Sequence, residues 1–398
     1  MADLLIATWL GGGATRNALR IGRELAERGH AVRISAPARF SHMTRDLGCE
    51  PAPHPPEAEF DPSLGRAVDD QSEFMRETFF GPWLAGAVQA LVADRRPDVI
   101  VVDYLLRSVA VQAEALGLTA VSLMHMASYR KPNAAGDPDA EWGWRWQYDQ
   151  VNRLRVDAGL QPLHPTPETS ATLAQACRAS RVVVTLPREL DSWPSPPENV
   201  VYVGPINESR SPAPWASPWP HEDERPLVVV TFGTTYMHQE DLLERALAAL
   251  APMPARVLVL TGDDFDPAEL RARPDIRVEH YVPHESVFPH AQLVITHGGM
   301  GTLLECFRAG VPSICIPLGR DQHENTRAAS ALNATLAVDA GASHSEIATA
   351  IEEALQSPTI RDGVDAMARA LARYGGAATA AHEIEQLATT PAISIGLT

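Results

Sequence analysis

The chain has 398 residues, of which 45% are hydrophobic and 21% are charged, as in a globular protein, and this length favours two domains. Its formal net charge of −17 argues against electrostatic binding to a polyphosphate backbone, so we expect no nucleic-acid partner. The four cysteines show no close paired spacing, which favours buried thiols over disulfides or a zinc site. No apolar run reaches the roughly 20 residues that span a bilayer, and the N-terminus lacks a signal peptide's basic residues and cleavage site. We therefore expect a cytoplasmic protein with no membrane partner.

Short apolar runs alternate with helical patterns in the first half of the chain. In chain order these runs are DLLIATWL, HAVRISA, PDVIVVDYL, TAVSLMHM, SRVVVTL and NVVYVG. The alternation predicts a parallel sheet with right-handed crossovers. Two longer segments, 51–93 and 127–180, are richer in aromatic residues and proline, which predicts inserted helices and loops.

A proline-dense stretch at 207–226 predicts a semi-rigid linker. After it the alternation restarts with PLVVVTFGT, ARVLVLTG, IRVEHYVP, AQLVITHGG and VPSICIPL, which predicts a second α/β domain. We assign the first domain to 1–206 and the second to 227–375, and we expect the segment 376–398 to pack back on the first domain. Two doubly wound domains joined by one linker typically bind a ligand in the cleft between them, at the carboxyl ends of their strands.

The most informative stretch is LVITHGGMGTLLECFRAGVPSICIPLGRDQHEN, at 293–325. A buried strand is followed by a glycine-rich turn at 297–302 that opens a helix, where backbone N–H groups and the helix dipole favour an anion. Glu305 lies one turn further along and offers acceptors to ribose hydroxyls, and the next strand brings Asp321 and Gln322 to the same edge. A glycine-rich turn alone is often only a close-packed turn. This combination of residues favours a nucleotide-sugar site instead.

The same stretch resembles the donor-binding signature of family 1 glycosyltransferases with the GT-B fold, and most resembles the actinobacterial branch that modifies natural products. This α/β fold has two doubly wound Rossmann-like domains that face each other across a cleft. The match covers the second domain closely and the whole chain by layout. Tyr281 departs from the more common Trp of the family's base-stacking position. The resemblance implies donor binding by Gly233, Thr234, Tyr281, Val282, His297, Gly299, Met300, Gly301, Thr302, Glu305, Asp321 and Gln322.

The first turn, ATWLGGGATRNALR, departs from the family at its catalytic position. Many members carry a histidine there that deprotonates the acceptor, and counting back from RELAERGH places Gly12 at that position. Variants with a W-x-G-G-G turn occur in the family. Asp103 and His125, which each end a strand, are then the alternative bases. Asp103 also suits a helix cap, and His125 also suits a structural role.

The acceptor is expected on the first domain. Gly11, Gly12 and Gly13 would make room for it or expose the backbone to it. Trp142 and Trp144 in EWGWRWQYDQ could stack on a flat acceptor, although core packing competes for them. The spacing of Asp264 and Asp266 is that of a metal-binding pair in another transferase fold, but their proline-flanked loop favours a solvated turn.

The resemblance implies an inverting hexosyl or deoxyhexosyl transferase that needs neither a metal nor another cofactor. Its donor would be a dTDP- or UDP-sugar and its acceptor a hydrophobic or aromatic small molecule. Three alternatives stay open: a nucleotide-sugar 2-epimerase, a cell-wall sugar transferase, and a catalytically silent nucleotide-sugar-binding partner that has lost its base at Gly12. A homodimer is also left open.

Overall fold

The structure is a computed structural model that describes residues 1–10, 12–56, 76–126, 138–164, 170–206, 214–233, 239–262, 275–319 and 321–389, without the side chains of 138–145. The chain divides into two compact units. Unit 1 comprises Met1–Asn207 and Tyr374–Thr398, and unit 2 comprises Glu208–Arg373. None of the described helices has the length and apolar character needed to span a membrane.

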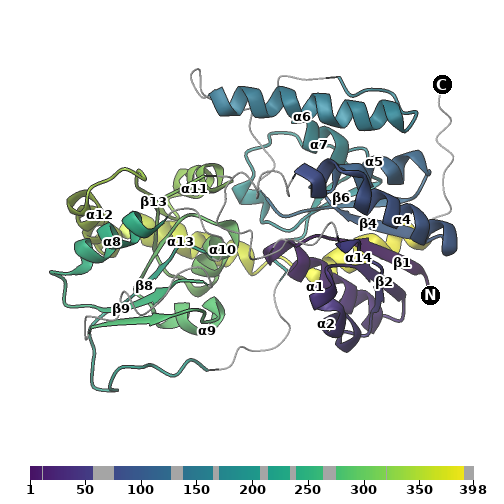
Figure 1. Ribbon diagram of the computed structural model, residues 1–398. Helices are drawn as coiled ribbons and strands as arrows, with labels where there is room; N and C mark the ends of the chain where they lie inside the picture. Colours follow the sequence, from purple (N-terminus) through teal and green to yellow (C-terminus); the bar gives the residue numbers. More distant parts are fainter. Residues whose placement is uncertain are drawn as a thin grey trace. The chain divides into compact units, whose positions relative to one another are not determined.

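Unit 1 contains a parallel seven-stranded sheet in the order β3-β2-β1-β4-β5-β6-β7 (Figure 1). Its strands are β1 (Asp3–Ala7), β2 (Ala31–Ser35), β3 (Glu50–Ala52), β4 (Val99–Asp103), β5 (Ala120–Met124), β6 (Arg181–Val184) and β7 (Val200–Tyr202). Its helices are α1 (Gly12–Glu27), α2 (Ser41–Asp46), α4 (Pro82–Asp94), α5 (Arg107–Ala115), α6 (Pro138–Asp157), α7 (Ala171–Ala176) and α14 (Ala377–Thr389).

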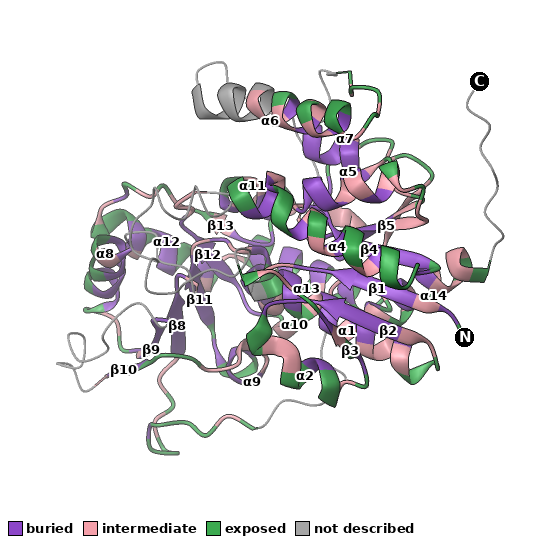
Figure 2. Ribbon diagram, turned by 45° about the vertical axis from the view of Figure 1, so that its right-hand side comes forward, coloured by how far each residue is buried: buried purple, intermediate pink, exposed green. Residues whose placement is uncertain are grey.

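The central strands of unit 1 are buried on both faces (Figure 2). Successive side chains of a strand point to opposite faces, so Leu4 joins the core beneath α1 and α14 while Leu5 joins the core beneath α4 and α5. This is why these strands read as continuous apolar runs. The helices that follow β1 and β4 therefore cover opposite faces, and the winding of the sheet reverses between these two strands.

Helix α14 packs against α1 although it lies at the far end of the chain. Ile384 is fully buried in the core of unit 1. The carboxylate of Glu385 lies 2.8 Å from the Arg28 guanidinium and 2.9 Å from the His30 ring. Burial raises the pKa of Glu385, but hydrogen bonds from His30 and Arg28 outweigh it and hold the pKa below its usual value. Helix α14 is thus attached to unit 1 by both packing and charge.

Unit 2 contains a parallel six-stranded sheet in the order β10-β9-β8-β11-β12-β13. Its strands are β8 (Leu227–Thr231), β9 (Arg256–Leu260), β10 (Ile276–Glu279), β11 (Leu293–Thr296), β12 (Ser313–Cys315) and β13 (Leu336–Ala337). Its helices are α8 (Glu240–Leu250), α9 (His284–Val287), α10 (Met300–Ala309), α11 (Gln322–Ala331), α12 (His344–Gln356) and α13 (Pro358–Leu371). The winding reverses between β8 and β11, because α8 and α10 pack in the cores on opposite faces.

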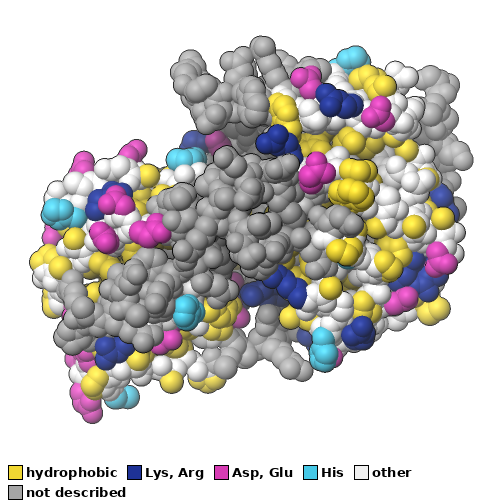
Figure 3. Space-filling model, viewed as in Figure 1, with side chains coloured by type: hydrophobic (Ala, Val, Ile, Leu, Met, Phe, Trp, Pro, Cys, Tyr) yellow, Lys and Arg dark blue, Asp and Glu magenta, His cyan; other side chains and the backbone are white. Residues whose placement is uncertain are grey.

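The proline-dense stretch is described from 214 to 226, and these residues belong to unit 2. Trp219 is 6% exposed and packs with Leu227 and Phe288 in one of the two cores of that unit. On the described surface visible in Figure 3, acidic and basic side chains lie interspersed.

We predict that Ile384→Ala destabilises unit 1 by about 2–5 kcal/mol, because it removes a fully buried side chain and leaves a cavity between α14 and α1. Urea unfolding followed by tryptophan fluorescence and circular dichroism measures this loss. Gln386→Ala, on the exposed side of the same helix, is the control and should change stability by less than about 0.5 kcal/mol. Equal effects of the two substitutions would show that α14 does not stabilise the unit through this core.

Candidate nucleotide-sugar site

The winding reversal of unit 2 brings two glycine-containing loops together. β8 and β11 pair in parallel with Thr231 opposite Thr296, so Gly233 and His297 follow neighbouring strand ends. A Cβ atom added to Gly233 would lie 2.8 Å from Cε1 of the His297 ring, and the φ angle of Gly233 is +88°. Both the space and the backbone conformation therefore require glycine at this position.

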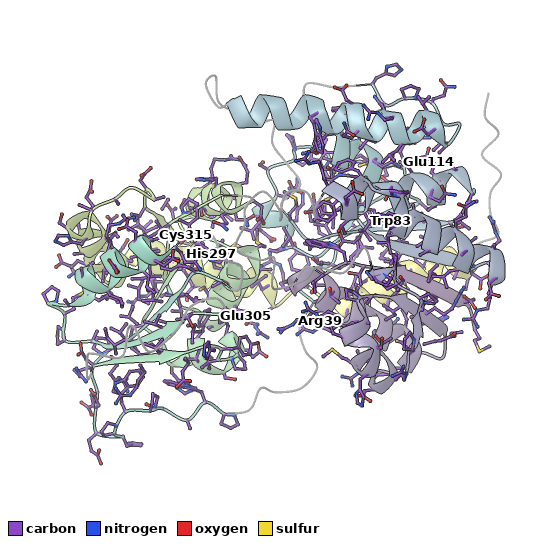
Figure 4. The ribbon with its side chains drawn as sticks, viewed as in Figure 1. Arg39, Trp83, Glu114, His297, Glu305 and Cys315 are labelled. Carbon is purple, nitrogen blue, oxygen red and sulfur yellow. The ribbon has the colours of Figure 1, made fainter. Side chains whose placement is uncertain are left out.

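A second glycine makes room for the same histidine. A Cβ atom on Gly299 would lie 2.6 Å from Nε2 of His297. On the other side of the ring, Nδ1 lies 3.3 Å from the hydroxyl oxygen of Thr296. Figure 4 shows His297 beside Cys315, as expected from the pairing of β11 with β12. The imidazole is thus held by its own loop and by Gly233.

Helix α10 begins in this loop with an open N-terminus. Gly299 is its N-cap residue, and no side chain of the described residues caps it. Met300 and Thr302 are buried, whereas Gly301 is exposed and has no atom within 4 Å of an added Cβ. The first N–H groups of the helix, which have no partner within the helix, are therefore available to an anion that the helix dipole also favours.

Helix α11 is tied to the glycine loop by Asn325, a residue that our sequence analysis did not single out. Asn325 is 1% exposed, and its Nδ2 donates to the Gly298 carbonyl at 3.2 Å and to Oδ2 of Asp321 at 2.9 Å. Gln322 is 3% exposed, and its side-chain oxygen accepts the N–H groups of Leu318 and Gly319. Asp321 and Gln322 are thus held in place by hydrogen bonds, and Gln322 also shapes the loop before it. The polar run DQHEN was the available signal for Asn325.

Three further predicted donor residues of unit 2, Tyr281, Val282 and Glu305, lie before and after the glycine loop in the sequence. Tyr281 is 53% exposed, which is unusual for an aromatic side chain, while the adjacent Val282 packs against an apolar core. An exposed ring on a fixed backbone is suited to stacking. Glu305 lies further along α10, with its side chain 21% exposed and its carboxylate paired with Arg308 (Figure 4).

The two predicted bases of unit 1 lie at neighbouring strand ends, with Asp103 at the winding reversal and His125 one strand away from it. Asp103 ends β4 and His125 follows β5, the neighbouring strand. His125 Nδ1 lies 3.5 Å from Oδ2 of Asp103, which is 1% exposed. Oδ1 of Asp103 accepts the N–H of Leu105, so this carboxylate also closes the turn before α5. Burial raises the pKa of Asp103, and the neighbouring His125, the Leu105 N–H, Trp9 and Arg107 oppose that shift.

Aromatic side chains and a buried cation surround this pair. The Trp9 ring meets Phe79 edge-on at 4.7 Å, and Tyr104 meets His125 edge-on at 4.8 Å between ring centroids. Arg107 is 5% exposed, and burial lowers its pKa to about 10. It donates to the hydroxyl of Thr172. Neither Trp9 nor Arg107 was selected from the sequence, although Trp9 belongs to the W-x-G-G-G turn.

Several predicted residues fall outside the described part of the chain. They are Gly11, Thr234, Asp264, Asp266 and the side chains of Trp142 and Trp144. Gly12 begins helix α1, and Gly13 is exposed with no atom within 4 Å of an added Cβ. The turn thus leaves open space at Gly13.

Comparisons with known proteins give a family match over part of the chain and a fold. Residues 178–370 match the model of the family described as UDP-glucoronosyl and UDP-glucosyl transferase. Demethyllactenocin mycarosyltransferase of Streptomyces fradiae is 31% identical over 175 residues, which are 44% of this chain and 37% of that protein. The 4'-demethylrebeccamycin synthase of Lentzea aerocolonigenes is 37% identical over 133 residues, 32% of this chain and 30% of that protein. These two alignments span less than half of either relative.

The crystal structure of the glycotransferase of kitacinnamycin superposes with a TM-score of 0.79 at 21% identity, over 97% of this chain and 99% of that one. At this identity the likeness establishes the fold, so the two parallel α/β sheets are those of the GT-B fold, as predicted from the sequence.

We predict opposite effects on stability for two alanine substitutions in the glycine loops of unit 2. Gly233→Ala should destabilise the protein by about 1–2 kcal/mol or more, because its φ is positive and its Cβ would meet His297. Gly301→Ala should stabilise it by up to about 1 kcal/mol, because it lies in the first turn of α10 with free space around it. Thermal unfolding of both variants tests this; a change of the same sign in both would contradict the described loop geometry.

Proposed function

We propose that this protein transfers a sugar from a dTDP- or UDP-sugar to a hydrophobic or aromatic small molecule. The match of residues 178–370 to the model of the UDP-glucoronosyl and UDP-glucosyl transferase family supports this proposal. The observation that carries this proposal is the open N-terminus of α10 at the winding reversal of unit 2. There, two glycines hold His297 beside free backbone N–H groups.

In this proposal unit 2 binds the donor. The diphosphate lies on the first N–H groups of α10, with His297 and Thr302 as further donors. The exposed ring of Tyr281 stacks on the nucleobase. Glu305 accepts from the ribose hydroxyls, and its pairing with Arg308 orients the carboxylate. Asp321, held by Asn325, accepts from the sugar hydroxyls.

The proposed reaction is a single displacement with inversion at the anomeric carbon. The acceptor oxygen attacks this carbon, and the bond to the diphosphate breaks on the opposite side. The leaving diphosphate gains negative charge, which the α10 dipole and backbone N–H groups stabilise without a metal ion or other cofactor.

Unit 1 is proposed to bind the acceptor. Three aromatic side chains, Trp9, Phe79 and Tyr104, lie near the Asp103–His125 pair, which supports a hydrophobic or aromatic acceptor. The relatives named for mycarose transfer and for rebeccamycin support a natural-product acceptor. Gly12 supplies no side chain for catalysis, which favours a catalytically silent nucleotide-sugar-binding protein as the second candidate function.

We predict that His297→Ala and Glu305→Ala each weaken the binding of dTDP or UDP by roughly 1.5–3 kcal/mol, because each removes a polar contact to a charged or hydroxylated part of the ligand. Isothermal titration calorimetry measures the affinity. The exposed residues His344 and Glu352 on α12 provide matched controls, and their alanine variants should bind as the parent does. Parent-like affinity in either site variant would remove that residue from the donor site.

We predict that sugar transfer survives dialysis against EDTA, because the proposed site stabilises the leaving diphosphate with backbone N–H groups. Product formation before and after chelation is measured by liquid chromatography with mass detection. Activity that disappears on chelation and returns with Mg²⁺ or Mn²⁺ would instead assign a metal ion to the reaction. Nucleotide binding without transfer to any acceptor would favour the silent binding protein.

A further inference from the structure

Several buried polar atoms of unit 1 have no hydrogen-bond partner among the described residues, and three of them belong to residues at the carboxyl ends of neighbouring strands. They are Nε1 of Trp9, Oδ2 of Asp103 and Nδ1 of His125. These residues follow or end β1, β4 and β5, which are neighbours in the sheet. Buried polar groups are normally paired, because an unpaired one destabilises the folded state. Three such atoms at the ends of neighbouring strands, at and beside the winding reversal, point to a site that is built for a purpose other than stability.

The pair formed by Asp103 and His125 is almost in hydrogen-bonding geometry. Nδ1 of His125 lies 3.5 Å from Oδ2 of Asp103, slightly beyond an ordinary hydrogen bond. The carboxylate cannot turn away freely, because its Oδ1 accepts the Leu105 N–H at 3.0 Å. Catalytic hydrogen bonds are often long in structures without substrate and shorten when substrate binds.

The His125 ring also contacts Tyr104, and part of the ring is exposed. The Tyr104 ring lies edge-on against the imidazole at 4.8 Å, and its hydroxyl donates to the Met126 sulfur at 2.8 Å. The side chain of His125 is 19% exposed although Nδ1 is buried. The accessible part of the ring therefore excludes the nitrogen that faces Asp103, which leaves Nε2 for an acceptor.

We propose that His125 is the general base of this glycosyltransferase, and that Asp103 and Trp9 are positioning residues that orient it. The inference rests on the proposed function and names the base of that same reaction. Gly12 has no side chain, so the residue that removes the acceptor proton comes from the end of β5 instead of the first turn.

The charged and polar groups around the pair suit this assignment. Burial raises the pKa of the Asp103 carboxyl, and His125, the Leu105 N–H, Trp9 and the Arg107 guanidinium on α5 oppose that rise. When the 3.5 Å separation shortens in the substrate complex, an ionised Asp103 accepts the Nδ1–H of His125, which fixes the tautomer with an unprotonated Nε2. The same carboxylate then stabilises the imidazolium that forms when the base is protonated.

In the proposed step, the acceptor loses its proton and forms the bond to the sugar. The acceptor O–H bond breaks and its proton passes to Nε2 of His125. The oxygen electron pair forms the new bond to the anomeric carbon. The bond from that carbon to the diphosphate oxygen breaks, and its electrons leave with the nucleoside diphosphate.

The test compares two acceptors that share one ring and differ in acidity. A panel pairs aromatic alcohols with the phenols of the same ring, for example 4-nitrobenzyl alcohol with 4-nitrophenol, and uses dTDP-glucose and UDP-glucose as donors. His125→Ala should lower kcat by at least about a hundredfold for the alcohol, because the proton must be removed by the protein. The loss should be far smaller for the phenol when the assay is run above the pKa of the phenol, because most of it is then ionised before it binds. His42→Ala, an exposed histidine on α2, is the matched control and should resemble the parent.

The roles of the positioning residues are tested by the separate effects of their substitution on kcat and KM. Asp103→Asn and Trp9→Phe should lower kcat with the alcohol and leave KM unchanged, and again affect the phenol less. Trp9→Phe keeps the apolar ring and removes only the N–H; Trp83→Phe, an exposed tryptophan on α4, is its control. Binding of dTDP or UDP should match the parent in all variants, and thermal unfolding measured beside it shows that each variant is folded at the assay temperature, which separates catalysis from folding.

Three results would overturn the inference. Parent-like kcat in His125→Ala, with a large loss in Asp103→Asn, would make Asp103 itself the base. An equal loss with alcohol and phenol would give His125 a structural role only. If the parent protein binds dTDP or UDP but transfers sugar to no member of the panel, both the proposed function and this assignment are overturned. If the parent is active and the His125→Ala variant is unaffected, only the assignment is overturned.

Discussion

Both units depend on the same constraint, which is that a parallel sheet must cover both of its faces with helices. Because consecutive crossovers are right-handed, a sheet that is covered on both sides must reverse its winding at one point. In unit 1 this point lies between β1 and β4, and in unit 2 between β8 and β11. The connections that leave there diverge to opposite faces, so the carboxyl ends of these strands are not covered by their own helices. The glycine loop of unit 2 and Asp103 of unit 1 both lie at such a point, and His125 lies at the next strand end.

The glycine loop shows how backbone geometry prepares a site for an anion. Gly233 and Gly299 leave space for one imidazole, and a Cβ on Gly298 would lie 2.4 Å from the Thr326 hydroxyl of α11. No described side chain caps the N-terminus of α10. The favourable field of this helix N-terminus is therefore not used by a described side chain, as the proposed binding of a diphosphate requires.

Unit 1 uses burial in a different way. Asp103, Arg107 and the Nδ1 atom of His125 are all withdrawn from water, which is unfavourable for charged groups unless their neighbours compensate. The low exposure also strengthens each remaining electrostatic interaction. Buried ionisable groups that lower the stability of the folded state but are well oriented are typical of functional sites.

The sequence by itself determined much of this protein. The apolar runs identified the central strands of both units, because strands buried on both faces have no polar positions. The glycine-rich turn at 297–302 and the polar residues after it predicted a resemblance to the family whose model matches residues 178–370, because spacing along one loop is a local property. The comparison with solved structures confirmed the GT-B fold. The donor and acceptor residues themselves remain predictions.

Only the tertiary structure decided which distant residues meet. The sequence selected Asp103 and His125 separately, but their 3.5 Å separation depends on the pairing of β4 with β5, which brings together segments 22 residues apart. Trp9 and Arg107 escaped notice because each looks like an ordinary aromatic or surface residue until its burial is known. Asn325 could not be selected from the sequence either, because its role depends on hydrogen bonds to Gly298, on another loop, and to Asp321. Local sequence patterns predict the helices, strands and turns. Contacts between different strands and loops depend on tertiary packing, which no single stretch of sequence predicts.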